Sequence, residues 1–278
     1  MMYASCNAWT ADSRAGFETV FCDFKEAGFQ GVELNIDKPG HSAHSLSMES
    51  TEKELKEIRR IADNTGMIIS GISTSLWGSN MVNNPVFSAE LMKKQIFAAQ
   101  ILGAGCILIV PGGRSSEVPL LTARQKCLSF LDSMRPVMEQ EKILVGVENV
   151  WNGFFTSPFD MIAFIREVNG CYLGAYYDPG NVEAFSFPED WIPILGEKVF
   201  RIHAKDFART DGRLNMGGTW QDITEGTMNW KSVISALAAV GYDGPVTAEV
   251  SKRDPHQSWP QYYQKVARTL QDILSAEH

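Results

Sequence analysis

The stretch ILVGVEN, residues 143–149, decides the fold of this chain, because a short apolar run ends there on one acidic residue, Glu148. Continuous apolar runs are typical of parallel strands that are buried on both faces. Three later runs repeat the pattern: LGAYYDPGN (173–181) carries Asp178, VFRIHAKD (199–206) carries His203, and PVTAEVS (245–251) carries Glu249. Each polar residue falls at or near the carboxyl end of its run. In a barrel of parallel strands, this end carries the chemistry.

Strand and helix patterns alternate on both sides of these four runs. Earlier strands are expected at residues 3–7, 31–36, 67–73 and 106–113. The clearest helix begins at Thr51, with Glu54 three residues later as in a capping box, and ends near Gly66. Eight strands separated by helices must pair in parallel, and eight such strands close into a barrel. The sequence therefore predicts an α/β fold, a (β/α)8 TIM barrel, as a single domain over residues 1–278.

The connections between the elements are consistent with a barrel. A long glycine-rich loop is expected after the seventh strand, up to a helix that Asn229 caps. The alternative, an open doubly wound sheet, requires a glycine-rich phosphate turn after the first strand. The stretch SCNAWTADSR (5–14) contains no such turn.

Composition limits the class of protein. The 278 residues are 44% hydrophobic, enough for one large core, and the net charge of −8 with a pI near 5.2 argues against a nucleic-acid partner. No apolar stretch approaches the ~20 residues of a membrane span, and the start lacks the pattern of a signal peptide. The five cysteines are scattered and include no CxxC pair, so we expect free thiols and a cytoplasmic protein without a membrane partner.

The four polar residues at the strand ends form a candidate metal centre. Taken singly, Glu148 and Glu249 would be ion-pair partners, His203 a core histidine and Asp178 a turn residue. On four consecutive strands they would meet at one rim, where three carboxylates without a cation would repel one another. We therefore expect one divalent metal, Mn²⁺ first, with Mg²⁺, Co²⁺ or Zn²⁺ as alternatives, and no organic cofactor.

Such a centre predicts proton transfer next to a carbonyl group. A metal would polarise the carbonyl of a chelated substrate, and Glu148 and Glu249 would lie on opposite sides of it. Removal of a proton on one face and return on the other gives epimerisation. Delivery to the neighbouring carbon gives aldose–ketose isomerisation instead. The residue types alone do not choose between the two reactions.

At these residues the chain resembles the xylose-isomerase-like barrel superfamily, and within it the sugar and sugar-phosphate isomerases and epimerases. That branch includes tagatose/psicose 3-epimerases, phosphopentulose 3-epimerases and hydroxypyruvate isomerases. The resemblance is densest from 143 to 254, through GVENVWN, YYDPGNV, RIHAKDF and VTAEV. It implies that Glu148, Asp178, His203 and Glu249 bind the metal and that the two glutamates are the acid–base pair. It also implies that Arg209 contacts substrate oxygens and that the protein forms a homodimer or homotetramer.

Two departures from this family pattern bear on the substrate. The free-ketohexose epimerases have a glutamate six residues after the first metal glutamate, where this chain has Phe154. They also have a histidine three residues after the metal aspartate, where this chain has Asn181, as in the phosphopentulose branch. Both differences argue against a free hexulose.

The expected rim of the barrel supplies candidate substrate contacts. Four tryptophans, Trp9, Trp77, Trp151 and Trp220, follow strands or lie in the long loop and are expected to form walls for a sugar. The last two strand loops are basic, with Lys205, Arg209, Arg213, Lys252 and Arg253. Together with Gly217, Gly218 and the helix that begins at Asn229, they favour a phosphate site, and a solvated rim with a Lys205–Asp206 ion pair is the alternative. The substrate-binding candidates are Arg209, Asn181, Lys205, Trp9 and Trp151.

For three further polar residues, Glu33, His41 and His44, the sequence indicates a setting but no specific role. Glu33 shares the inward face of its strand with Asn35, and either supports the site or forms an internal ion pair. His41 and His44 lie in a polar loop and are expected to be solvated.

The function predicted is a metal-dependent isomerase or epimerase of a small sugar or sugar phosphate. A lyase or dehydratase that forms the same enediolate is the first alternative. A phosphodiester hydrolase of the abasic-site type would need more metals and more histidines than the five present. A non-catalytic sugar-binding barrel would be expected to lose one of the two glutamates, and both are present.

Overall fold

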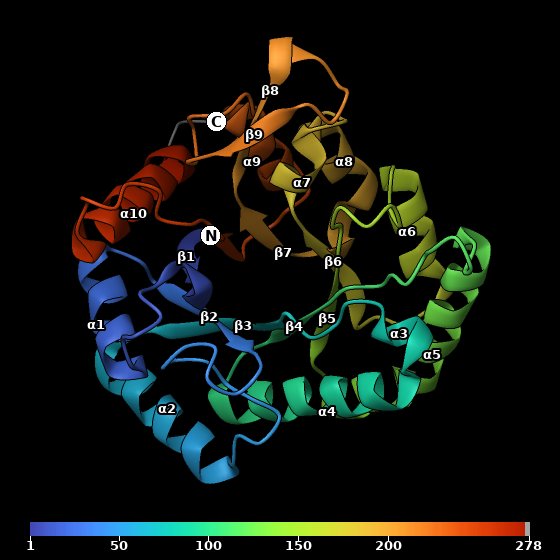
Figure 1. Cartoon of the computed structure of the whole chain (residues 1–278), viewed down its shortest axis with the longest axis horizontal. Coiled ribbons are helices and arrows are strands. Elements are labelled where there is room, and N and C mark those ends of the chain that lie inside the picture. The colour runs from blue at the N-terminus through green and yellow to red at the C-terminus, as the bar shows by residue number, and fades with distance from the viewer. Residues whose placement is uncertain (276–278) are drawn as a thin grey trace.

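Eight parallel strands close into a barrel in the computed structural model, which describes residues 1–275 (Figure 1). Around the barrel the strands follow the order β1-β10-β7-β6-β5-β4-β3-β2. Their bounds are β1 (Tyr3–Asn7), β2 (Gly31–Ile36), β3 (Ile68–Thr74), β4 (Cys106–Ile109), β5 (Leu144–Glu148), β6 (Leu173–Tyr177), β7 (Val199–Ala204) and β10 (Pro245–Ala248). The predicted (β/α)8 fold is confirmed.

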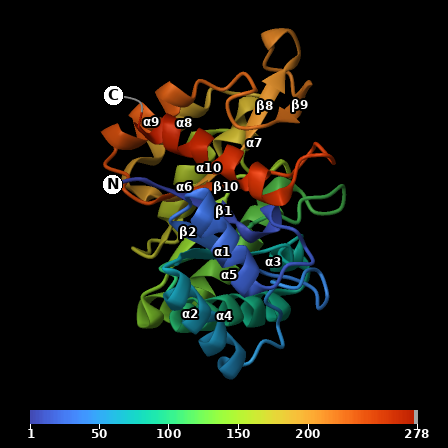
Figure 2. The same cartoon turned by 90° about the vertical axis from the view of Figure 1, so that its left-hand side faces the viewer.

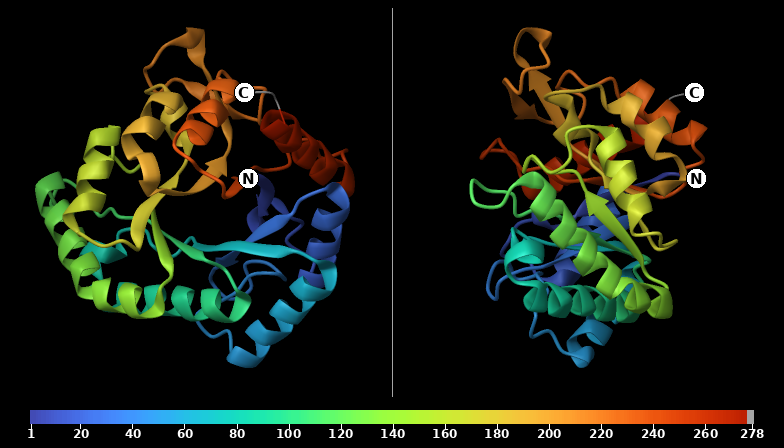
Figure 3. Two further views of the ribbon diagram at one scale, coloured as in Figure 1. Left: turned by 180° about the vertical axis from the view of Figure 1, so that it is seen from behind. Right: turned by 90° about the vertical axis from the view of Figure 1, so that its right-hand side faces the viewer.

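Helices surround the barrel, as the views along its axis and from behind show (Figures 1 and 3). They are α1 (Phe17–Ala27), α2 (Glu52–Thr65), α3 (Asn80–Asn83), α4 (Pro85–Leu102), α5 (Leu120–Glu141), α6 (Pro158–Glu167), α7 (Pro179–Glu183), α8 (Pro188–Leu195), α9 (Trp230–Ala239) and α10 (Trp259–Ser275). The last helix, α10, packs against α1 and β1, so the two ends of the chain close the ring (Figure 2).

Local sequence explains where several helices begin. Thr51 accepts a hydrogen bond from the backbone N–H of Glu54, and the Glu54 carboxylate accepts one from the N–H of Thr51, which is the expected capping box. Asn229 caps α9 in the same way through the N–H of Ser232. Gly66 ends α2 with φ of 67°, a left-handed conformation that glycine adopts without a steric penalty.

The loop expected after the seventh strand contains a hairpin that the sequence analysis missed. Strands β8 (Asp206–Arg209) and β9 (Gly218–Gln221) pair antiparallel and extend beyond the barrel (Figure 2). The anchor of this hairpin is Asp206, whose carboxylate accepts hydrogen bonds from the indole N–H of Trp230 and the backbone N–H of Thr224. Because these partners are 18 and 24 residues away, the local pattern of four-residue strands does not reveal the pairing.

The end of the fourth strand and the role of the Asp178 side chain also differ from the prediction. The fourth strand ends at Ile109 and not at residue 113, since Pro111 cannot donate a backbone hydrogen bond. Asp178 does not only begin a turn: its side chain accepts from the N–H of Asn181 and caps the short helix α7.

Two predictions about side chains were wrong. Trp77 is buried in the core, where its indole N–H donates to the carbonyl oxygen of Leu108 over 3.0 Å, so it forms no substrate wall. His44 is also buried. Its two ring nitrogens lie 2.8 and 2.9 Å from the carbonyl oxygens of Ala15 and Ala8, which replace contacts with water. His41 is exposed, as expected.

Two further expectations can be compared with the structure. All five cysteines are free thiols, as predicted. Within residues 1–275, no helix has both the length and the apolar composition needed to cross a bilayer.

The capping box of α2 gives a stability test. Thr51→Ala should lower the free energy of unfolding by about 1 kcal/mol, because one N–H of the first helical turn loses its acceptor. Urea denaturation followed by circular dichroism measures the change. Lys53→Ala, at an exposed position of the same helix, is the matched control. A loss for Thr51→Ala no larger than for the control would contradict the assigned role.

Candidate metal centre

Four neighbouring strands of the barrel deliver the four candidate ligands to one rim. Glu148 is the last residue of β5, Asp178 directly follows β6, His203 lies near the end of β7, and Glu249 directly follows β10. The barrel order places β5, β6, β7 and β10 side by side. One ligand atom from each side chain lies within 4.8 Å of each of the others.

The donor set fits one divalent ion. Two ligands on opposite sides of an ion at about 2.1–2.4 Å lie about 4.2–4.8 Å apart, so four atoms within 4.8 Å can share one ion. Asp178 Oδ2 and Glu249 Oε2 are buried and make no hydrogen bond of normal geometry, and their charge is balanced by the Lys205 ammonium 2.8 and 2.9 Å away. Three carboxylates and one imidazole suit a hard or borderline metal. The structure brings the predicted ligands together, and their role as ligands stays a prediction.

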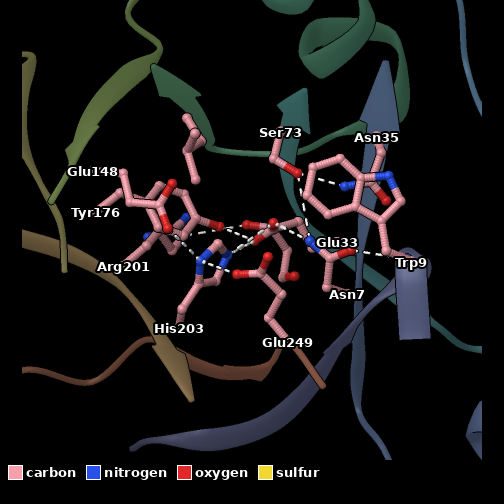
Figure 4. Close-up of polar contacts among 12 residues, drawn as sticks. Asn7, Trp9, Glu33, Asn35, Ser73, Glu148, Tyr176, Arg201, His203 and Glu249 are labelled. Carbon is pink, nitrogen blue, oxygen red and sulfur yellow. Dashed lines mark hydrogen bonds and ion pairs between the residues drawn. The ribbon is translucent and has the colours of Figure 1, made fainter. Parts of the chain in front are cut away.

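His203 lies at the middle of this group, with its two ring nitrogens facing different partners (Figure 4). Nδ1 is 3.2 Å from Glu148 Oε1 and 3.0 Å from Glu249 Oε2. Nε2 is 3.0 Å from Oε1 of Glu33, a fully buried carboxylate on β2. The ion pair that the sequence analysis considered for Glu33 therefore has His203 as its partner.

The charges of the site shift one another's pKa values. Burial raises the pKa of Glu148 and of Asp178. Burial would also raise the pKa of Glu249, but Lys205 and His203 outweigh it and hold that pKa well below its usual range. Burial disfavours the charged imidazole, yet Glu33 and Glu249 raise the pKa of His203 well above its usual value. A metal that binds Nδ1 must therefore displace the imidazole proton that the surrounding carboxylates stabilise.

Lys205 supplies a second cation between the candidate ligands. Its Nζ lies 2.8 Å from Asp178 Oδ2 and 2.9 Å from Glu249 Oε2, so the expected alternative, a Lys205–Asp206 pair, was wrong. Burial would lower the pKa of Lys205, but Asp178 and Glu249 raise it well above the usual value. Lys205 and a divalent ion would compete for these two oxygens.

One supporting residue was missed in the sequence. Asn149 accepts from the N–H of Asp178 at 2.9 Å and donates to the Asp178 carbonyl oxygen at 2.7 Å, which ties the ends of β5 and β6 together. Its position directly after Glu148 is the only sign of this role in the sequence.

The rim residues predicted to contact substrate lie in different settings. Trp151 is 44% exposed, stacks on Trp220 at 4.9 Å, and donates its indole N–H to the carbonyl oxygen of Asn181. This leaves a fixed aromatic surface beside the metal centre. Trp9 lies on the side of the site away from Glu148, beside Asn7 and Asn35 (Figure 4). Its indole N–H donates a hydrogen bond of 2.8 Å to Asp37. Contact of these residues with a substrate stays a prediction.

The basic residues expected to bind phosphate mostly have partners within the chain. Arg209 pairs with the Glu183 carboxylate at 2.9 Å and donates to the carbonyl oxygens of Glu183 and Ser186. Lys252 donates to two carbonyl oxygens of its own loop, and Arg253 lies 3.9 Å from Asp222. Phe154, where the ketohexose epimerases have a glutamate, packs against two phenylalanines in the core. The phosphate site stays a prediction.

Residues 22–273 match the family described as xylose isomerase-like TIM barrel. The chain belongs to this family. Among curated proteins, the 3-oxo-isoapionate decarboxylase of Pectobacterium atrosepticum is 29% identical over 105 residues, which are 37% of this chain and 37% of that protein. The match thus spans little more than a third of the relative's length.

Solved structures of the family share the whole barrel. A xylose isomerase domain protein of Alicyclobacillus acidocaldarius has a TM-score of 0.79 at 19% identity, with 99% of both chains covered. D-psicose 3-epimerase in the presence of D-fructose has a TM-score of 0.68 at 18% identity, covering 95% of this chain and 90% of the epimerase. A Mycobacterium smegmatis family protein in complex with magnesium has a TM-score of 0.74 at 17% identity, covering 99% and 97%. At these identities the likeness shows the fold.

Because Lys205 contacts two of the candidate ligands, its charge should affect the affinity of the site for a metal. Lys205→Met should lower the Mn²⁺ dissociation constant about tenfold, or ~1.4 kcal/mol, because a competing positive charge leaves two of the ligands. Isothermal titration calorimetry measures this affinity. Lys252→Met removes a rim lysine that donates to two carbonyl oxygens and lies over the Trp259 ring, and it should leave the affinity unchanged. Weaker Mn²⁺ binding by Lys205→Met would show that the lysine supports the ion instead of competing with it.

Proposed function

We propose that this protein is a divalent-metal-dependent isomerase or epimerase of a small sugar or sugar phosphate. Glu148, Asp178, His203 and Glu249 would hold the metal, with Mn²⁺ the first candidate. When bound, the metal would supply Lewis-acid polarisation of a carbonyl group next to the reacting carbon.

The observation that carries this proposal is the placement of the two glutamates. Along the barrel, Glu148 and Glu249 stand on the outer two of four neighbouring strands, with Asp178 and His203 between them. Both carboxylates face Nδ1 of His203, within 3.2 Å. A substrate bound to a metal held there would thus have one carboxylate on each side.

This arrangement divides the proton transfers between two groups. One glutamate would take the proton from the carbon next to the carbonyl, and the other would return a proton to the opposite face. Return to the same carbon inverts its configuration, and return to the neighbouring carbon exchanges aldose and ketose. The exposed face of Trp151 offers an apolar surface for the C–H face of a sugar ring.

A decarboxylase is the second candidate, and the Pectobacterium relative favours it. In a 3-oxo acid, the bond to the carboxylate carbon breaks and its electron pair enters the carbonyl, giving carbon dioxide and an enolate. A protonated glutamate, Glu148 or Glu249, would then deliver the proton to carbon. The same residues thus serve both reactions, and the fate of the substrate distinguishes them.

Glu148→Gln and Glu249→Gln should each reduce turnover by about 10²–10⁴-fold, because each removes one proton-transfer group. The measurement is NMR of the Mn²⁺-loaded protein in D₂O with a panel of ketoses, their phosphates and 3-oxo acids. Deuterium at the carbon next to the carbonyl, with a new epimer or aldose, supports the proposal. Release of carbon dioxide with deuterium in the product would replace it with the decarboxylase. Near-normal turnover in both variants would contradict the acid–base roles of Glu148 and Glu249.

The matched control is Glu183→Gln, which neutralises a buried glutamate that pairs with Arg209. Circular dichroism of all three variants shows whether the fold is intact. Equal loss of turnover in the control, whose glutamate holds Arg209, would mean that the loss reflects disturbance of the rim and not removal of a proton-transfer group.

A further inference from the structure

A buried polar network faces the second ring nitrogen of His203. Glu33 on β2 is 0% exposed, and its Oε1 and Oε2 lie 3.0 and 3.3 Å from His203 Nε2 (Figure 4). A carboxylate can only accept a hydrogen bond, so Nε2 must be the donor. The contact joins β2 to β7 across the inside of the barrel.

Two more donors converge on the same carboxylate. Asn7 on β1 donates from Nδ2 to Glu33 Oε1 over 2.7 Å, and the hydroxyl of Tyr176 on β6 donates to Oε2. Three strands thus each provide one donor to Glu33. These bonds are what a carboxylate without solvent contact needs to stay ionised. Burial raises the pKa of Glu33, but the pairing with His203 outweighs it and lowers that pKa.

The strand pairing is irregular next to both Glu33 and Tyr176. The β2–β3 register shifts between Val32 and Glu33, and the β6–β7 register shifts between Ala175 and Tyr176. A local shift of register turns a side chain to a new direction, and such shifts are common beside functional sites. Here the two shifts fall at the two residues that meet inside the barrel.

Two glycines make room for the tyrosine. A Cβ added at Gly71 on β3 would lie 2.8 Å from the Tyr176 hydroxyl oxygen, and one at Gly146 on β5 would lie 2.7 Å from the Tyr176 ring. Both distances are shorter than side-chain contacts allow. The inward position of Tyr176 therefore depends on glycine in both strands, which makes the network a built feature of the barrel.

We propose that Glu33 is a positioning residue of the metal centre: by accepting the Nε2 proton of His203, it leaves Nδ1 as the nitrogen available to a metal. A neutral imidazole carries one proton, so the hydrogen bond at one nitrogen decides which nitrogen offers its lone pair. Tyr176 and Asn7 hold Glu33 in place. This inference rests on the metal centre of the proposed function and is independent of its substrate.

The first test measures metal affinity in three variants. Glu33→Gln should raise the Mn²⁺ dissociation constant about 10–100-fold, the usual effect of losing such a partner of a ligating histidine. Tyr176→Phe removes one donor to Glu33 and should give a smaller rise. Glu183→Gln neutralises another buried carboxylate and should leave the affinity unchanged. Electron paramagnetic resonance of free Mn²⁺ gives the dissociation constants without any substrate.

The second test reads the histidine directly. Nitrogen-15 NMR of the Zn²⁺-loaded wild type should show His203 protonated at Nε2 and bound through Nδ1. Glu33→Gln should show a mixture of ring forms, or loss of the Nε2–H signal. A merely structural role would lower the melting temperature but leave metal affinity and ring form as in the wild type.

Each outcome supports or overturns the role. Wild-type affinity and an unchanged ring form in a folded Glu33→Gln variant would overturn it. If that variant does not fold, Tyr176→Phe decides: unchanged affinity overturns the role and weaker binding supports it. A wild-type protein without Mn²⁺ affinity would overturn both the metal centre and the role of Glu33. Normal Mn²⁺ affinity without turnover of any sugar would contradict only the substrate part of the proposed function.

Discussion

Repulsion among buried carboxylates is the constraint on which this site depends. Three buried carboxylates, Glu33, Glu148 and Asp178, converge inside the carboxyl end of the barrel with the partly buried Glu249. Without positive charge, such a group would take up protons or force the strands apart. His203 and Lys205 provide that charge within the chain. A divalent ion would take over this function, which couples metal binding to the protonation of His203 and the position of Lys205.

The barrel makes this concentration of charge tolerable. Closed parallel pairing fixes the strand ends next to one another, so ligands separated by 101 residues in the chain, from Glu148 to Glu249, need no flexible loop to meet. Asn149 ties two strand ends together, and Glu33 fixes one nitrogen of His203. The rigid strands thus carry the charged groups, while the β8–β9 hairpin and Trp151 form the surface beside them.

The fold and the grouping of the ligands follow from local patterns, and the remaining contacts do not. Buried strands appear as apolar runs, and the barrel order then puts Asp178 and His203 side by side. The partners of Lys205 and Arg209 could not be predicted, because they depend on where distant carboxylates point. Tyr176 gave no sign of its role either, since an aromatic residue in a buried strand usually indicates only packing. Its position follows from glycines on two other strands.

Anomalous diffraction from a crystal grown with Mn²⁺ would locate the ion and identify its ligands directly. We expect one strong peak, coordinated by Nδ1 of His203 and by carboxylate oxygens of Glu148, Asp178 and Glu249. Nε2 of His203 should remain bonded to Glu33. A peak coordinated by other residues, coordination through Nε2, or no peak at saturating Mn²⁺ would contradict the proposed metal centre.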